Sequence, residues 1–374
     1  MTVDRIFKRV AIVGVCLMAF VGGCAQEGQQ PVGPPAQAKQ QVKAAAEQAA
    51  VPAPKPATAA KPKPSEAAPK APARGSVKIA LKPAPNEQTS YKVTAQARRS
   101  IKWQGPVPQK GAFEESFNDE QAEMVITQRI QSVDANGRVI AQVTIDSLKY
   151  LSIIKNQPSV DFDSSRQADA GSLLAKLIGQ SYTIEFGPDN YIASVPDLSA
   201  ARALMSGRTP ADRAGLNILS PEAITERHAT LMLPQAGREQ LKPGNKWSRI
   251  KTFSFGLMGL KSYEKIYTLK EVRDAGGQRI AVIDMKAIPS SEVESKYREQ
   301  QAGTNFPKMF DSNDMYTGSG EVDLTAGRIN SFHENLQASW IAAMPPNPGE
   351  SVDANEPVVL RMTATRIYGL EKIK

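Results

Sequence analysis

Cysteine and histidine are scarce in this sequence. Its 374 residues include two cysteines, Cys16 and Cys24, and two histidines, His228 and His333. Both cysteines lie near the N-terminus, so the rest of the chain has no disulfide, no cysteine nucleophile and no cysteine metal site. Neither histidine has another histidine or a cysteine at ligand spacing, which argues against a zinc site. We expect structural roles for both histidines and predict no metal and no other cofactor.

Signatures of catalysis are missing as well. No serine lies in the Gly-x-Ser-x-Gly pattern of hydrolases. The stretches Gly256–Gly259 and Gly318–Gly320 are not followed by the Lys-Ser/Thr of a phosphate loop, so we interpret them as a strand connection and a turn. The formal net charge is +8, but no basic cluster is interleaved with aromatic residues. We predict that the protein is not an enzyme and that nucleic acid is not a partner.

The apolar run Val10–Phe20 is shorter than the roughly 20 residues that a membrane-spanning helix needs. Basic residues precede it and small residues follow it, as in a secretory signal peptide over residues 1–23. The stretch ends in Val21-Gly22-Gly23-Cys24. This ending resembles a bacterial lipobox, which implies cleavage after Gly23 and acylation of the Cys24 thiol and of its new amine. The alternative is an ordinary signal peptide with an incidental cysteine.

Ala25 and Gln26 follow the cysteine, and neither is acidic. In lipoproteins of double-membrane bacteria, an acidic residue there tends to retain the protein in the inner membrane. The resemblance therefore favours the periplasmic face of the outer membrane, with the membrane as a partner through the N-terminal lipid. Several acyl chains would give stable attachment, whereas one short chain would not.

Residues 24–75 comprise the anchor and a low-complexity segment rich in Ala, Pro, Lys and Gln. This segment has almost no large apolar side chains, so burial cannot offset the entropy cost of ordering it. We interpret it as a disordered tether that holds the folded part away from the membrane. Contact of its lysines with peptidoglycan is an alternative.

From residue 76 to 374 the pattern is that of a globular, β-rich domain. Alternating segments flank turn sequences at Asp134–Gly137, Gly187–Asn190 and Asp274–Gly277, which predict hairpins. The order of turn, strand, Phe-Asp-Ser and hairpin occurs twice, over about residues 86–196 and 246–340. We interpret this as an internal repeat of two similar sheet halves.

Helical patterns are confined to insertions, which we expect at Ser165–Ile178, Asp197–Met205, Pro221–Leu231 and Ser291–Gln301. Helices grouped between sheet halves favour an α+β fold that is mostly antiparallel β, with two half-barrel-like halves and helical cover. The signal peptide and the tether precede this domain.

The Asp134–Arg138 hairpin, the two Phe-Asp-Ser triplets and Pro243–Trp247 resemble a family of bacterial secreted proteins and lipoproteins that share a domain of unknown function. The resemblance covers roughly residues 86–370 and carries no catalytic signature. A curved antiparallel sheet wrapped on helices is also similar to half-barrel periplasmic lipoprotein carriers, an analogy of fold that transfers no site.

Two sets of residues are candidates for binding. Asp161 and Asp163 could bind calcium, but they lack the pattern of a calcium loop, and capping of the following helix explains them more simply. We interpret Asp311 and Asp314 in the same way. Six large side chains could line an apolar ligand cavity, although such residues usually form core: Trp103, Trp247, Phe253, Phe255, Met258 and Trp340.

Two functions follow from these observations. The first is a non-catalytic binding or carrier module for an apolar or lipid-like ligand. The second is an envelope interaction or structural protein whose sheet contacts protein or peptidoglycan. A carrier needs an apolar cavity of at least about 300 Å³, whereas an interaction module does not.

Overall fold

The computed structural model describes residues 75–105, 113–228, 231–234, 240–297, 310–343 and 358–373. The predicted signal peptide, with Gly23, and the predicted anchor Cys24 lie outside the described residues, as does nearly all of the tether.

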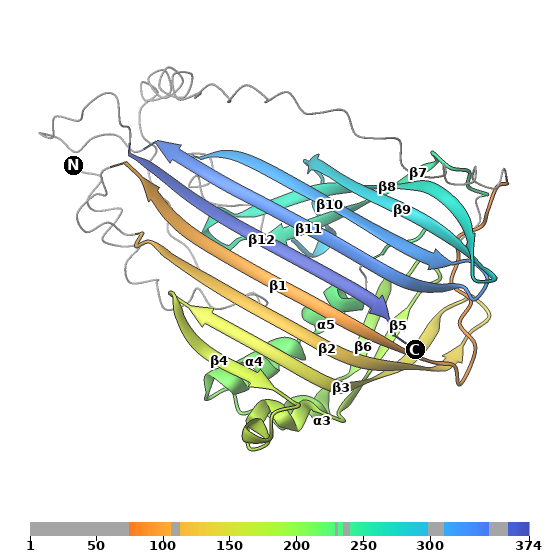
Figure 1. Cartoon of the computed structure of the whole chain (residues 1–374), viewed down its shortest axis with the longest axis horizontal. Helices are drawn as coiled ribbons and strands as arrows, with labels where there is room; N and C mark the ends of the chain where they lie inside the picture. Colours follow the sequence, from red (N-terminus) through yellow and green to blue (C-terminus); the bar gives the residue numbers. More distant parts are fainter. Residues whose placement is uncertain are drawn as a thin grey trace, which may run out of the picture.

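Twelve strands form one open sheet in which every described pairing is antiparallel (Figure 1). The order across the sheet is β6-β5-β3-β2-β1-β12-β11-β10-β9-β8-β7, and β4 pairs with β3 beyond the segment of β3 that pairs with β5. The fold is α+β and mostly antiparallel β, as the sequence predicts, but the sheet is not a closed barrel. The strands are β1 Gln88–Gln104, β2 Ser116–Val133, β3 Val139–Ile154, β4 Gln157–Asp163, β5 Ser181–Phe186, β6 Ile192–Asp197, β7 Lys246–Ser254, β8 Leu260–Ala275, β9 Gln278–Ser290, β10 Asp311–Asp323, β11 Arg328–Ala343 and β12 Val359–Lys372.

The three predicted hairpins are confirmed. At Asp134–Gly137 the Asp134 amide donates to the Arg138 carbonyl at 2.9 Å, and Gly137 has φ 78°. Glycine reaches this left-handed region without the penalty that a Cβ atom imposes. The turns at Gly187–Asn190 and Asp274–Gly277 likewise join β5 to β6 and β8 to β9.

The sheet contains two runs of strands in which successive members are neighbours. One run is β1-β2-β3-β5-β6 and the other is β7-β8-β9-β10-β11, and β12 lies between β1 and β11. The Phe-Asp-Ser triplets differ in position: the first ends β4, whereas the second begins β10. Each triplet precedes the last hairpin of its run.

Three α-helices, α3 Ser199–Ala203, α4 Pro210–Ile218 and α5 Pro221–His228, lie behind the lower strands in Figure 1. α4 contacts β4 and α5 contacts β6, so both cover the concave side of the first run. The sequence patterns located α3 and α5 but missed α4. Its signal is a capping box, in which the Thr209 side chain accepts from the Asp212 amide and the Asp212 carboxylate accepts from the Thr209 amide.

Two helix predictions and one turn prediction are wrong in part or whole. Ser165–Ile178 contains two short 3₁₀ helices, η1 Gln167–Asp169 and η2 Leu173–Leu177, instead of an α-helix. The start of the predicted 291–301 helix is irregular, and residues 298–301 lie outside the described part. Gly318–Gly320 is not a turn but lies within β10. Glycine serves close packing here, because a Cβ atom on Gly320 would lie only 3.1 Å from the Phe332 ring. Gly256–Gly259 is the predicted strand connection, from β7 to β8.

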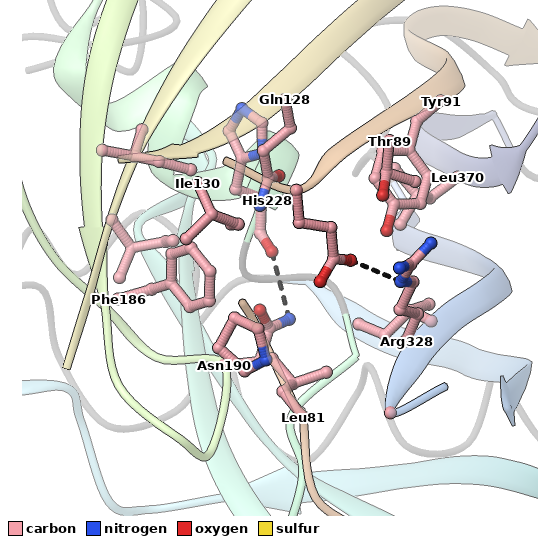
Figure 2. A pocket seen from close by; sticks show the side chains of 16 residues that line it. Leu81, Thr89, Tyr91, Gln128, Ile130, Phe186, Asn190, His228, Arg328 and Leu370 are labelled. Atoms are coloured by element: carbon pink, nitrogen blue, oxygen red, sulfur yellow. Dashed lines mark hydrogen bonds and ion pairs between the residues drawn. The ribbon is translucent and has the colours of Figure 1, made fainter. Parts of the chain in front are cut away.

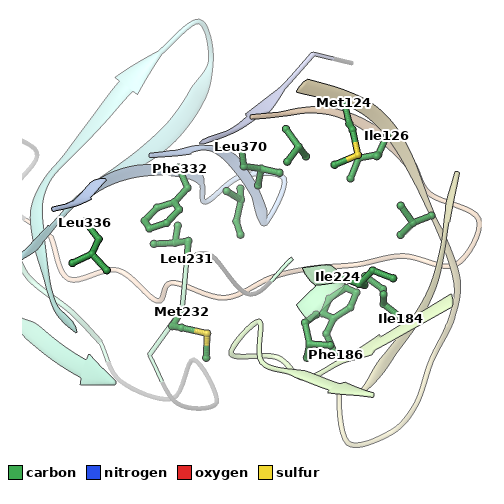
Figure 3. Close-up of a cluster of buried hydrophobic side chains, with 14 of the residues drawn as sticks. Met124, Ile126, Ile184, Phe186, Ile224, Leu231, Met232, Phe332, Leu336 and Leu370 are labelled. Atoms are coloured by element: carbon green, nitrogen blue, oxygen red, sulfur yellow. The ribbon is translucent and has the colours of Figure 1, made fainter. Parts of the chain in front are cut away.

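The concave side of the sheet, which we call the trough, holds the hydrophobic core. Figure 3 shows Met124, Phe332, Leu336 and Leu370 projecting into it from the sheet. Leu231 and Met232, from the segment between α5 and β7, enter the same space. Among the helices that the structure describes, none has the length and hydropathy of a membrane span.

Candidate functional site

The six predicted cavity residues lie in separate parts of the core. Phe253, Phe255 and Trp340 are buried together, with ring centroids 6.3 Å apart for Phe253 and Phe255 and 5.0 Å apart for Phe255 and Trp340. Met258, in η4 Gly256–Met258, is buried as well.

The other two tryptophans are anchored by hydrogen bonds. Trp247 stacks on Tyr267 with centroids 5.6 Å apart, and its Nε1 donates to the Met232 carbonyl at 2.9 Å. Trp103, near the end of β1, donates to the Phe113 carbonyl at 2.7 Å. None of the six lines either cavity described below. Their role in ligand binding stays a prediction.

A short segment crosses one end of the trough before β1 begins. We call residues 77–83 the strap; it is the orange segment leading into β1 at the right of Figure 1. Val77 exchanges two backbone hydrogen bonds with Leu241, both 2.7 Å, and the Lys82 amide donates to the Gly327 carbonyl at 3.0 Å. Ile79, between these attachments, is fully buried. Along the strap Val77 and Ile79 are buried and Lys78 is exposed, and this alternation serves a single bridged crossing.

A cavity of about 70 Å³ lies between the strap and the sheet (Figure 2). It is formed by the strap, β1, β2, the β5–β6 hairpin, α5, β11 and β12. The lining residues are Leu81, Pro83, Glu87, Thr89, Tyr91, Gln128, Ile130, Ile184, Phe186, Asn190, Ile192, His228, Gly327, Arg328, Ile329 and Leu370.

The cavity is amphipathic. Its inner wall is apolar and buried, with Ile184, Phe186 and Ile192 on the β5–β6 hairpin. Glu87 and Arg328 form an ion pair that is more exposed than this wall, with side chains 15% and 30% exposed, although Arg328 Nε is itself buried. Burial raises the pKa of Tyr91 to about 12, while Arg328 and Glu87 act on it in opposite directions. Tyr91 therefore remains a neutral hydroxyl.

His228 belongs to the buried wall and is held by a polar network. Its Nε2 lies 2.9 Å from the Tyr182 hydroxyl, which also accepts a hydrogen bond from Arg227 at 3.0 Å. Asn190 donates to the carbonyls of His228 and Leu231. Burial, with the adjacent charge of Arg227, lowers the pKa of His228 to about 3, so the imidazole is neutral at pH 7. These contacts agree with the structural role expected for His228, although it is more buried than expected.

Two ion pairs lie in the trough on the side of the second run. Lys265 Nζ is 2.7 Å from Glu334 Oε2, which also accepts from the Tyr316 hydroxyl at 2.9 Å. Lys261 Nζ is 2.6 Å from Asp314 Oδ1. The interpretation of Asp314 as a cap is therefore wrong: it faces the trough from β10, and Lys261 approaches it from β8.

The acidic pair in the first run makes local contacts but caps no helix, because η1 begins at Gln167 and has no side-chain cap. Asp163 Oδ1 accepts from both the amide and the hydroxyl of Ser165, at 2.9 and 2.7 Å. Asp161 pairs with Arg166 at 2.8 Å. In the described part of the chain, no three His, Cys, Asp or Glu side chains converge in a way that could hold a metal ion.

A second hollow of about 400 Å³ lies on the outer face of the sheet, over β1 to β4. Nine of its fourteen lining residues have polar or charged side chains, and none of the six predicted cavity residues is among them. The residues around it are Thr94, Ala95, Gln96, Gln121, Ala122, Glu123, Lys149, Tyr150, Leu151, Asp161, Phe162, Asp163, Arg166 and Ile367.

The sequence patterns missed the residues that form the cavity under the strap. Glu87 and Arg328 are far apart in sequence, and only the pairing of β1, β12 and β11 brings them together. The predicted hairpin at Gly187–Asn190, whose Asn190 lines the cavity, was a local signal near this site. An expectation that a chain segment packs against Gly327 would have required the tertiary fold.

Comparison with known proteins defines the fold only coarsely. No protein-family model matches the chain, and no curated protein matches it. A solved structure that concerns lipid–protein interactions in lipovitellin is similar, with TM-score 0.36 and 12% sequence identity. The match covers 78% of this chain and 25% of the lipovitellin chain, so this chain spans about a quarter of that protein's length. At this identity and TM-score the likeness assigns no function to this chain.

Proposed function

We propose that the protein is a non-catalytic binding module for an apolar, acyl-chain-like ligand, held at the cell envelope by a lipid on Cys24. The observation that supports this proposal is the amphipathic cavity under the strap. Its inner wall is apolar, and its charged pair is more exposed than that wall. An acyl chain with a polar end matches that distribution.

The size of the cavity indicates how the ligand enters. About 70 Å³ is well below the roughly 300 Å³ at which small-molecule pockets begin. A chain-like ligand would therefore displace the strap and occupy the space of Val77, Ile79 and Leu81, which pack on the core. Three backbone hydrogen bonds, two at Val77 and one at Lys82, join the strap to Leu241 and Gly327. Exchange of apolar strap side chains for an acyl chain keeps the core apolar.

A reversible crosslink tests this entry route. Val77 and Leu241 are a hydrogen-bonded antiparallel pair, for which Cα atoms lie about 5.5 Å apart, within the disulfide range. In the full chain with Cys16→Ser and Cys24→Ser, the variant Val77→Cys/Leu241→Cys would have one thiol pair. We expect the oxidised protein to lose binding of a fluorescent fatty acid and the reduced protein to regain it.

The parent protein without the new cysteines, given the same oxidant, is the control. Equal binding by oxidised and reduced protein would show that the ligand does not enter under the strap. Wild-type protein that binds no fatty acid, and yields no lipid on organic extraction after purification from cells, would refute the proposed function.

The anchor is tested separately. We expect wild-type protein to incorporate labelled palmitate and to fractionate with the outer membrane. Cys24→Ser should do neither, because it removes the thiol that would carry the diacyl group. Labelling that persists in Cys24→Ser would contradict the proposed anchor.

A second function, contact with peptidoglycan or an envelope protein, is supported by the outer face of β10, β11 and β12. Twelve neighbouring outward positions carry no Asp, Glu, Lys or Arg. Protein surfaces are about 25–35% charged, so roughly three or four charges are expected there. Interface cores are depleted in charge. The positions are Asn313, Met315, Thr317, Ser319, His333, Asn335, Gln337, Ser339, Thr363, Thr365, Ile367 and Gly369.

Co-sedimentation with purified peptidoglycan and crosslinking in cells test this second function. Thr317→Lys places a charge within the uncharged face and should weaken either contact. Ser248→Lys adds the same charge at an exposed outward position of β7, outside that face, and serves as the control. Equal contact by both variants would refute this use of the face.

A further inference from the structure

Charged side chains of both signs lie at the cavity under the strap. Arg328 is paired with Glu87, and both line the cavity. Lys82, on the strap, lies beside them, because its backbone amide donates to the carbonyl of Gly327, the residue before Arg328. Arg328 and Glu87 therefore form one charge pair in the lining, and Lys82 is a further cation beside it.

Lys82 binds neutral groups rather than a carboxylate. Its Nζ donates to the Leu324 carbonyl at 2.6 Å and approaches the Thr325 carbonyl at 3.3 Å. Displacement of Glu87 from Arg328 by an anionic head group would keep the guanidinium paired. A cationic or uncharged head group could not replace the Glu87 carboxylate in this way.

Hydroxyl groups lie on the same side of the cavity. Thr89 and Tyr91 project from β1 among the lining residues, next to Arg328 in Figure 2. Hydroxyls can donate to an anion whose remaining oxygens are held by a guanidinium. The apolar side chains of Ile130 and Phe186 form the opposite part of the wall in Figure 2.

We propose that the ligand of this site is an amphiphile with an anionic head, a carboxylate or a phosphate monoester, held at the rim by Arg328 together with the hydroxyls of Thr89 and Tyr91. This rests on the function proposed above. Arg328 offers the planar donor fork that matches either anion. Glu87 competes with the ligand for Arg328 and is displaced from it when the head group binds. The alkyl chain runs from the rim toward Phe186 and Ile184.

Displacement of a bound fluorescent fatty acid from the full chain by decanoate, decyl phosphate and decanol tests the proposal. We expect wild-type protein to bind one of the two anions about tenfold more tightly than decanol, the scale of one charge-assisted hydrogen bond. Arg328→Gln should abolish that preference and keep decanol binding. Glu87→Gln should strengthen anion binding by removing the competing carboxylate.

Arg129→Gln is the matched control. Arg129 is an exposed cation near the rim that donates to the Asn86 side chain at 3.1 Å and does not line the cavity. It should leave the preference unchanged. A larger affinity for decanoate or for decyl phosphate identifies which anion the rim fits.

The outcomes distinguish a failure of the anionic head group from a failure of the apolar binding site. Equal wild-type affinities for decanol and both anions would overturn the anionic head group and leave the apolar site standing. No binding of any of the three would overturn both. Loss of decanol binding in a folded Arg328→Gln protein would show that Arg328 supports the wall, and would overturn its role in head-group binding.

Discussion

The buried pair Lys265 and Glu334 allows a stability prediction of substantial size. Lys265 is 4% exposed, and its Nζ lies 2.7 Å from Glu334 Oε2. Burial lowers the pKa of Lys265, but attraction to Glu334 outweighs it and raises the pKa well above its ordinary value. The lysine is therefore charged in the core at neutral pH. The change Glu334→Gln keeps the shape of the side chain and removes the compensating charge.

We expect Glu334→Gln to lower the free energy of unfolding by about 3–5 kcal/mol, the usual cost of breaking a buried pair from one side. The double variant Lys265→Met/Glu334→Leu removes both charges and should recover most of this loss. It leaves the Tyr316 hydroxyl without its acceptor, which costs about 1–3 kcal/mol, so Tyr316→Phe added to the pair should restore stability further. Urea denaturation of the full chain, followed by circular dichroism, measures each step.

The exposed pair Lys270 and Asp284 is the control. These side chains are 60% and 52% exposed and 3.4 Å apart, so solvent screens their attraction and Asp284→Asn should cost below about 1 kcal/mol. If Glu334→Gln costs no more than Asp284→Asn, the inner pair is solvated and the reasoning from burial fails. If the double variant is as unstable as the single one, the loss arises from packing and not from charge.

Three further predictions concern stability. The fold lowers the pKa of His228 to about 3, so as pH falls the unfolded chain takes up a proton on this histidine before the folded chain does. The free energy of unfolding should therefore drop by about 1.4 kcal/mol per pH unit from pH 6.5 toward 3. His228→Gln should remove this loss, whereas His333→Gln, on the exposed face, should not. A Cβ on Gly318 would lie 2.7 Å from the His333 carbonyl oxygen, so Gly318→Ala should destabilise by about 1–3 kcal/mol in urea denaturation, whereas Gly171→Ala, with open space, should be neutral. Thr209→Ala removes the α4 cap and should cost about 1 kcal/mol; no loss would show that the cap is replaced by water.

Local signals in the sequence predicted much of the sheet. Asp134–Gly137 and Asp274–Gly277 specify their hairpins through residues that adopt turn conformations, whatever the rest of the chain does. The capping box at Thr209 is an equally local signal for α4, which the apolar patterns do not reveal. The failure at Gly318–Gly320 shows the opposite case. There glycine serves close packing between strands, which a turn rule cannot distinguish.

The polar residues of the trough illustrate what sequence patterns leave out. Tyr263, Lys265 and Tyr267 alternate along β8 and share its inner face, so the alternation itself places the lysine inward. Sequence alone gives no reason to accept a buried lysine until Glu334 is known to lie beside it. The same holds for Glu87 and Arg328 at the rim. Their partners come from strands that are neighbours in space and distant in sequence.

The position of β12 has a consequence for how the protein folds. It is the last strand along the chain, yet it pairs Tyr91 of β1 with Lys372 and also pairs along β11. Both runs of strands can form early, because each is built from consecutive neighbours. Until β12 arrives, however, β1 and β11 each present a long unpaired edge that can recruit other chains. Contacts of such sequence separation form slowly, so a binding protein that shields these two edges would protect the folding domain from aggregation.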